Sequence, residues 1–179
     1  LKKPTNRQVE LKQFFVENQD IFKLKLLFIF DSNAEFDRGV DFFEEKESHV
    51  HNTGEKLEDI VVGQYRKIFD ESEINTLTED DELKRKSRRQ LINLDIEAAK
   101  QLDNKKMFIG QNAEKEIKSL GLTPSSPTLS WFFDSVRRYH LTACKFLLKY
   151  FKAPLSSSII ANMAALNPKL QKHVTTPSK

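Results

Sequence analysis

The chain has 179 residues, of which 39% are hydrophobic, 10% aromatic and 31% charged, with a formal net charge of +3. Fourteen phenylalanines against five glycines and six prolines exclude a disordered or collagen-like chain and argue against a turn-rich β-sandwich. The longest apolar run, residues 24–30, contains a lysine and is too short to span a bilayer, so we expect no membrane partner.

The first two elements are predicted to be helices. Residues 6–17 follow a polar start and place Val9, Phe14 and Phe15 on one helical face. Residues 21–30 are very apolar, and because Lys23 and Lys25 alternate with apolar neighbours, a strand is the alternative there. We favour a helix because the adjacent segments are helical.

The clearest pattern lies between residues 36 and 68, where ten positions spaced by alternating steps of four and three include seven apolar residues. Such a stripe faces one partner helix. The region is predicted to be either one kinked helix or two helices broken near residues 52–54. The stripe comprises Phe36, Val40, Phe43, Glu47, Val50, Gly54, Leu57, Val61, Gln64 and Ile68.

The middle of the chain is predicted to be a surface connection with short helices. Residues 71–82 are polar and acidic, and residues 84–89 are strongly basic. The spacing of Leu91, Leu94, Ala98 and Leu102 predicts a short helix. Asn112 is expected to cap another helix that runs to Leu120, with Gly121 in the left-handed stop position.

A long amphipathic helix is predicted near the C-terminus. Ser126 and Pro127 form a typical helix start, and apolar residues then recur at helical spacing as far as Tyr150. We expect this helix to end before Pro154. Residues 156–158 are expected to cap a last core helix that contains Ile159, Ile160, Met163 and Leu166.

These elements define an all-α fold, which we expect to be an irregular helical bundle with two long amphipathic helices. One domain over residues 1–179 is the default for this length. We divide it into an acidic helical half (1–70), connecting loops and short helices (71–127) and a basic helical half (128–179). Because the sequence begins with Leu1 and no initiator methionine, we expect it to be an excerpt of a longer chain.

Charge is segregated along the chain. Residues 31–82 carry five basic and seventeen acidic side chains, whereas residues 83–179 carry eighteen basic and six acidic ones. This asymmetry can neutralise itself within the molecule, or it can present a basic face to a polyanion.

No complete catalytic or metal site emerges from the sequence. The glycines are too widely spaced for a phosphate loop. Cys144 lies four residues after His140, so a nucleophile–base pair is feasible, but a small buried thiol beside a half-exposed imidazole is the simpler interpretation. A single cysteine also cannot form an internal disulfide, which favours a reducing, intracellular setting.

Two groups of residues are typical of nucleic-acid contact, in which cations neutralise phosphates and aromatic rings stack on bases. Alternatively, the first group is a solvated loop that docks on the acidic helix, and Trp131 is packed core. The groups are the cluster Lys84, Arg85, Lys86, Arg88 and Arg89, and the later set Trp131, Arg137 and Arg138.

The order of several segments resembles the hAT superfamily of transposases. Residues 42–47 (FFEEKE), leading through His51 to Leu57 and Phe69, resemble the family's FQ…iH…L…F helix. Residues 107–114 (MFIGQNAE) resemble its "ifiGeea" segment. Residues 133–140 (FDSVRRYH) and 147–151 (LLKYF) resemble its "VReFyvaaaeyLlkkfp" helix, and residues 165–168 (ALNP) resemble "vLdP".

The resemblance implies that this chain is the helical insertion of an RNase H-like catalytic domain, or of a host protein descended from a transposase. It implies a nuclear location. The implied partners are DNA, the rest of the parent chain and possible further copies of the chain itself. The catalytic carboxylates, and a divalent metal such as Mg²⁺, are expected only outside this fragment. It also makes Trp131 a candidate for assisting a flipped base. Where the family has glutamine after the phenylalanine of FQ, this chain has Phe43 or Glu44, which leaves a domesticated relative without DNA-cleaving activity as the alternative.

Overall fold

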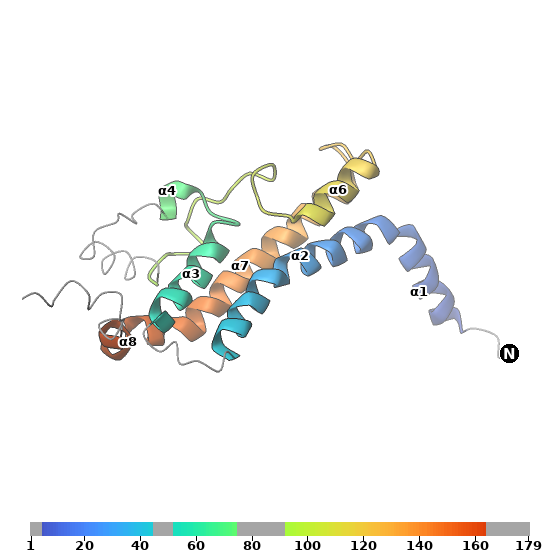
Figure 1. Cartoon of the computed structure of the whole chain (residues 1–179). Coiled ribbons are helices and arrows are strands. Elements are labelled where there is room, and N and C mark those ends of the chain that lie inside the picture. Colours follow the sequence, from blue (N-terminus) through green and yellow to red (C-terminus); the bar gives the residue numbers. More distant parts are fainter. Residues whose placement is uncertain (1–4, 45–51, 75–91, 164–179) are drawn as a thin grey trace, which may run out of the picture. The chain divides into compact units, whose positions relative to one another are not determined.

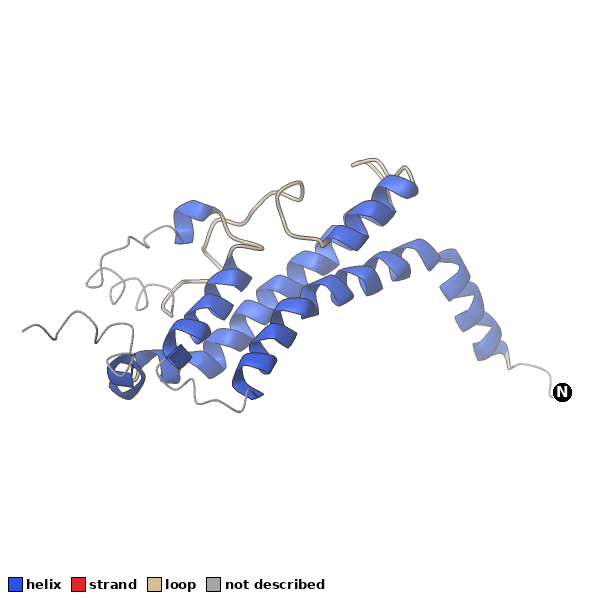
Figure 2. Cartoon of the chain, viewed as in Figure 1, coloured by secondary structure: helices blue, strands red, loops and turns tan. Residues whose placement is uncertain are grey.

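The computed structural model describes residues 5–44, 52–74 and 92–163, and these residues form helices joined by loops (Figures 1 and 2). The predicted all-α class is confirmed. None of the helices in the described ranges has an apolar stretch long enough to cross a membrane. The helices are α1 (Asn6–Glu17), α2 (Gln19–Glu44), α3 (Thr53–Tyr65), α4 (Glu71–Ile74), α6 (Gln111–Ser119), α7 (Pro127–Ser156) and α8 (Ser158–Met163).

The chain divides into two compact units, each assembled from separate stretches of sequence. The first unit contains residues 1–34 and 109–138, and the second contains residues 35–108 and 139–179. This division does not follow the acidic and basic halves, because the second unit takes residues from both. The arrangement as a single domain remains a prediction.

The core of the first unit lies between α2 and α7. Ile21, Leu24 and Phe28 are buried at helical spacing on α2, and the Phe28 ring packs edge-on against Phe132 of α7 at a centroid distance of 6.3 Å. A strand would place Leu24 and Leu26 on the same face, yet Leu24 is fully buried and Leu26 is 67% exposed. The helix predicted over residues 21–30 is therefore confirmed, and the strand alternative is wrong.

Helix α1 matches its predicted bounds and turns away from α2 (Figure 1). The rings of Phe14, Phe15 and Phe22 contact one another where α1 meets α2, with centroid distances of 4.9 to 6.1 Å. This aromatic cluster explains the close connection of two helices around Asn18, whose side chain donates a hydrogen bond to the Phe14 carbonyl.

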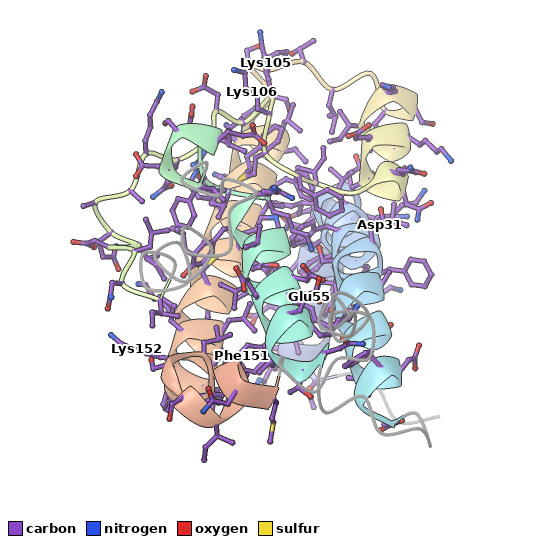
Figure 3. The ribbon with its side chains drawn as sticks, turned by 60° about the vertical axis from the view of Figure 1, so that its left-hand side comes forward. Asp31, Glu55, Lys105, Lys106, Phe151 and Lys152 are labelled. Atoms are coloured by element: carbon purple, nitrogen blue, oxygen red, sulfur yellow. The ribbon has the colours of Figure 1, made fainter. Side chains whose placement is uncertain are left out.

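The start of α6 is fixed by a carboxylate from α2. Asp31, which is labelled in Figure 3, accepts hydrogen bonds from the backbone N–H of Asn112, at 2.7 Å, and from the Asn112 side-chain amide. Gly110 is the N-cap residue, with φ 84° and ψ 152°, so the predicted cap at Asn112 is wrong by two positions. Asp31 performs the capping role from another helix because it satisfies an N–H group that the first turn leaves unpaired. Gly121 has a φ of 61°, which confirms the predicted left-handed stop.

Part of the long stripe is confirmed in the second unit. Gly54, Leu57, Val61, Gln64 and Ile68 are all buried in or just after α3. Earlier in the stripe, however, Val40 is 51% exposed, and residues 45–51 lie outside the described part. The stripe is thus divided between two helices. A single long helix over 36–68 is wrong, because α2 begins at Gln19 and ends at Glu44, and Asn52 is the N-cap of α3.

Residues 92–108 form an ordered loop, so the short helix predicted over residues 91–102 is wrong. Its backbone pairs with the segment that follows α3: the N–H of Leu102 donates to the Ile68 carbonyl at 2.7 Å, and Phe108 N–H donates to Lys67 at 3.1 Å. Asp95 accepts hydrogen bonds from the N–H groups of Glu97 and Ala98, which gives a local turn instead of a helix.

One further prediction about the connections needs correction. Residues 71–74 were assigned to a surface connection, but they form the short helix α4 and Ile74 is 1% exposed, because an apolar side chain at the end of this turn packs into the core. Residues 75–91 lie outside the described part of the chain.

The end of α7 also differs from the prediction. The predicted start at Pro127 is confirmed, but the helix continues through Pro154 to Ser156. A proline this close to the end removes one backbone donor in the last turn, where the helix is about to stop. The cap of α8 is confirmed, since the Ser157 hydroxyl accepts a hydrogen bond from Ile159 N–H. Ile159 itself is 64% exposed, so it is not a core residue here, and Leu166 lies outside the described residues.

The geometry around Gly110 predicts a large effect of adding one methyl group. A Cβ at this position would lie 2.3 Å from Asp31 Oδ2, and the backbone conformation is one that almost only glycine adopts. We expect Gly110→Ala to lower the free energy of unfolding by about 3 kcal/mol or more. Gly121→Ala is the matched control: its φ is also positive, but nothing lies within 4 Å, so the loss is about 1–2 kcal/mol. Urea denaturation measures both, and equal losses would contradict the role of Asp31.

Candidate nucleic-acid interface

The later set of predicted contact residues lies on α7 in the first unit. Trp131 is 57% exposed, so the interpretation of this side chain as packed core is wrong. Arg138 is also exposed and follows Trp131 by seven residues, which places the two on nearly the same side of the helix. Asp134 lies between them on that side and is exposed. The indole and the guanidinium are therefore both available to a ligand, next to one carboxylate.

Arg137 differs from its neighbour. It is partly buried and already interacts with other groups of the protein, so it is not a free cation. The structure thus separates two arginines that the sequence grouped together. The other predicted group, Lys84, Arg85, Lys86, Arg88 and Arg89, lies outside the described residues.

The second unit contains a basic groove that the sequence analysis did not identify. It is open, has a volume of about 380 Å³, and lies between the loop of residues 92–96 and the C-terminal part of α7. Ile92, Leu94 and Ile96 form the apolar wall on the loop side. The α7 side carries three lysines around Leu148, and we call this site the lysine groove; its lysines are Lys145, Lys149 and Lys152 (Lys152 is labelled in Figure 3).

The lysines of the groove have different surroundings. Lys145 forms an ion pair with Glu97, and both side chains are more than half exposed. The ammonium group of Lys149 lies 5.3 Å from the centre of the Tyr150 ring. The sequence did contain a signal for this site: spacings of four and three place all three lysines on one face of a helix, and no acidic residue follows Asp134.

A buried polar cluster lies on the opposite side of α7. His140 is fully buried; its Nε2 is 2.9 Å from the Phe108 carbonyl oxygen, and its Nδ1 is 3.0 Å from the Gln64 side-chain nitrogen. An amide nitrogen donates and a carbonyl accepts, so in this arrangement Nδ1 faces a donor and Nε2 faces an acceptor. The prediction of a half-exposed imidazole is therefore wrong, because the ring is used to connect α3, α7 and the loop that ends at Phe108.

Cys144 is a buried structural thiol, in agreement with the simpler of the two interpretations. Its exposed fraction is zero, and burial raises its pKa to about 12. A thiol with such a pKa is almost entirely protonated at neutral pH and is a poor nucleophile. Within the described ranges, no three His, Cys, Asp or Glu side chains are placed to hold a metal ion.

Comparison with known proteins gave no match to a family model, to a curated protein or to a solved structure.

Burial of two ionisable groups predicts a loss of stability in alkali. Burial raises the pKa of Cys144 from 9.0 to about 12, and burial together with the nearby Cys144 raises that of Tyr65. Both groups stay protonated in the folded chain while the unfolded chain loses protons. The free energy of unfolding should therefore fall as pH rises above about 9, by up to about 1.4 kcal/mol per pH unit for each group.

The test is the slope of stability against pH, measured by urea denaturation between about pH 8 and 11. Cys144→Ala should give a shallower slope than the wild type. Val136→Ala is the control, because it also truncates a fully buried α7 side chain but removes no ionisable group. Equal slopes for the two variants would show that Cys144 does not contribute to the alkaline loss.

Proposed function

We propose that this chain is a non-catalytic helical insertion of a hAT-like DNA transposase, which supports the nuclease core and contributes a basic surface to DNA. The proposal includes a nuclear location and the rest of the parent chain as a partner. Its first support is the resemblance of five segments, in the same order, to the motifs of that family.

Three of the resembling segments, residues 107–114, 133–140 and 147–151, lie wholly in the described part of the chain. Residues 107–114 contain Gly110, which begins α6 in a conformation that requires glycine. Residues 133–151 all belong to α7, where they supply both buried side chains such as His140 and exposed cations such as Arg138. The first segment thus supplies a turn that requires glycine, and the later segments supply a helix with one buried and one exposed face. These local structures account for the residue types found in both motifs.

The observation that carries the proposed contact with DNA is the exposure of Trp131. A tryptophan that is 57% exposed places a large apolar ring in water, and an aromatic ring in that position can stack on a base. Arg138, two turns further along α7, supplies a cation on the same side.

A second candidate function is a protein-interaction module of a domesticated, transposase-derived protein without DNA-cleaving activity. It is favoured by apolar side chains that remain in water on α1 and α2. Phe30 is 72% exposed, Leu26 67% and Val16 64%. Exposed apolar groups that are close together typically mark contact surfaces for other proteins, or for a second copy of the same chain.

Binding to duplex DNA across a salt series separates the two candidates. The transposase-like function predicts affinity that falls by roughly 10²–10³ between about 50 and 200 mM salt if the five cations of residues 84–89 contact phosphates. Changing Lys84, Arg85, Lys86, Arg88 and Arg89 to glutamate should weaken binding and flatten this dependence. Trp131→Ala should weaken binding to hairpin DNA without changing the salt slope, because an indole neutralises no phosphate.

Fluorescence anisotropy with hairpin and linear duplexes provides the measurement. Circular dichroism of each variant confirms that it retains its helices. No binding of the unmodified chain at low salt would favour the protein-interaction module.

A further inference from the structure

We propose that the lysine groove binds the sugar–phosphate backbone of a nucleic acid, without reading its sequence. This inference rests on the proposed function, and it assigns a specific site on the second unit that involves none of the residues expected from the sequence. The three observations that carry it are the spacing of the lysines, the composition of the groove and the ion pair at its edge.

The lysines form a row along α7. Lys145, Lys149 and Lys152 are four and three residues apart, so they lie on one face and extend over about 10 Å of helix axis. Each strand of a DNA duplex advances about 3.4 Å along the duplex axis per phosphate. The row of lysines is therefore long enough to face about three successive phosphates of one strand. Lysine suits this role because its ammonium is a mobile point charge that needs no fixed geometry.

The rest of the groove contributes contact area without base recognition. None of the described residues that line it is acidic or aromatic, and only Asn93 adds a neutral polar side chain. Without an aromatic platform the groove cannot stack bases, and with a single amide it cannot read a series of base edges. Its apolar wall can contact sugar carbons, so the backbone is the part of a nucleic acid that fits.

The carboxylate of Glu97 pairs with a lysine that, in our proposal, contacts a phosphate of the nucleic acid. Glu97 forms this ion pair with Lys145 from the loop side of the groove. Asp95 fixes the turn from which Glu97 extends, by accepting the Glu97 N–H at 3.0 Å. A carboxylate paired with an ammonium resembles a phosphate contact, so backbone binding must displace Glu97 from Lys145. Because both side chains are exposed, this displacement costs little.

The experiment measures binding of the full chain to linear duplex DNA across the same salt series. The variant Lys145→Gln/Lys149→Gln/Lys152→Gln should reduce the salt slope by about 2.7, because three phosphate contacts are lost. That difference corresponds to about 40-fold between about 50 and 200 mM salt. The control Lys12→Gln/Lys115→Gln/Lys118→Gln removes the same charge from exposed positions of α1 and α6, and its slope should match that of the unmodified chain.

Glu97→Gln provides an independent test with the opposite sign. It should raise affinity about two- to fivefold, since it frees Lys145 from an exposed ion pair. Asp95 is left unchanged, so the turn is preserved. A loss of affinity in Glu97→Gln, or no change, would show that Glu97 does not compete with phosphate.

The outcomes distinguish the groove from the proposed function. If the unmodified chain binds DNA and the groove variant keeps the full salt slope, the groove inference is overturned while the proposed function stands. If the unmodified chain does not bind, both fail. Polyglutamate serves as a competitor: competition as strong as that of unlabelled duplex would assign the groove to an acidic protein segment and would overturn the inference.

Discussion

The second unit depends on one chain of buried hydrogen bonds. The Gln64 amide contacts His140, and His140 donates to the carbonyl of Phe108, so α3, α7 and the loop are connected through a single imidazole. Gln64 and His140 are buried, and a buried donor or acceptor that is left unpaired costs about 1–3 kcal/mol. His140 is the group common to both bonds, so a shift of α7 breaks both, whereas a shift of α3 or of the loop breaks one of them.

This constraint positions the lysine groove as well. The loop of residues 92–108 has no helix of its own, and it is held at its end by His140 and by the pairing of Leu102 and Phe108 with the segment after α3. The Lys67 ammonium, on a residue that is only 5% exposed, lies 5.1 Å from the centre of the Phe108 ring and adds a further contact there. Helix α7 thus has two faces with different roles. The buried face carries His140, which holds the end of the loop, and the exposed face carries the three lysines of the groove.

Sequence periodicity predicted helix α3, in which Leu57 and Val61 recur at helical spacing. In residues 21–30 the alternating lysines left helix and strand open, and a helix was favoured because its neighbours are helical. The burial of Ile21, Leu24 and Phe28 shows that this prediction is correct. One failure comes from contact between residues far apart in the sequence. Asn112 looked like a helix cap, but the capping carboxylate comes from Asp31, and no local pattern could reveal it.

The candidate site shows the same limit. The spacing of Lys145, Lys149 and Lys152 was visible in the sequence, but their significance depends on the wall formed by Ile92 and Ile96, which only the fold brings near. The sequence pattern favoured residues 84–89 instead, because five cations in six positions are a stronger local signal than three on successive helical turns. Burial corrected the expectation for His140, which is enclosed, and excluded the packed-core alternative for Trp131, which is exposed.

The described residues offer two kinds of surface, the lysine groove and the exposed apolar side chains of α2. Their contributions to binding depend differently on salt concentration. The lysine groove attracts a polyanion through charge, so its contribution must weaken as salt screens the ammonium groups. The exposed side chains of Leu26 and Phe30 would instead contribute through burial of apolar area, on the order of 1–2 kcal/mol each, and moderate salt changes that contribution little. The apolar residues belong to the first unit and the groove to the second, so contact with a nucleic acid and contact with a protein need not compete for the same side chains. If both proposals hold, the salt dependence of each association reveals which surface is responsible.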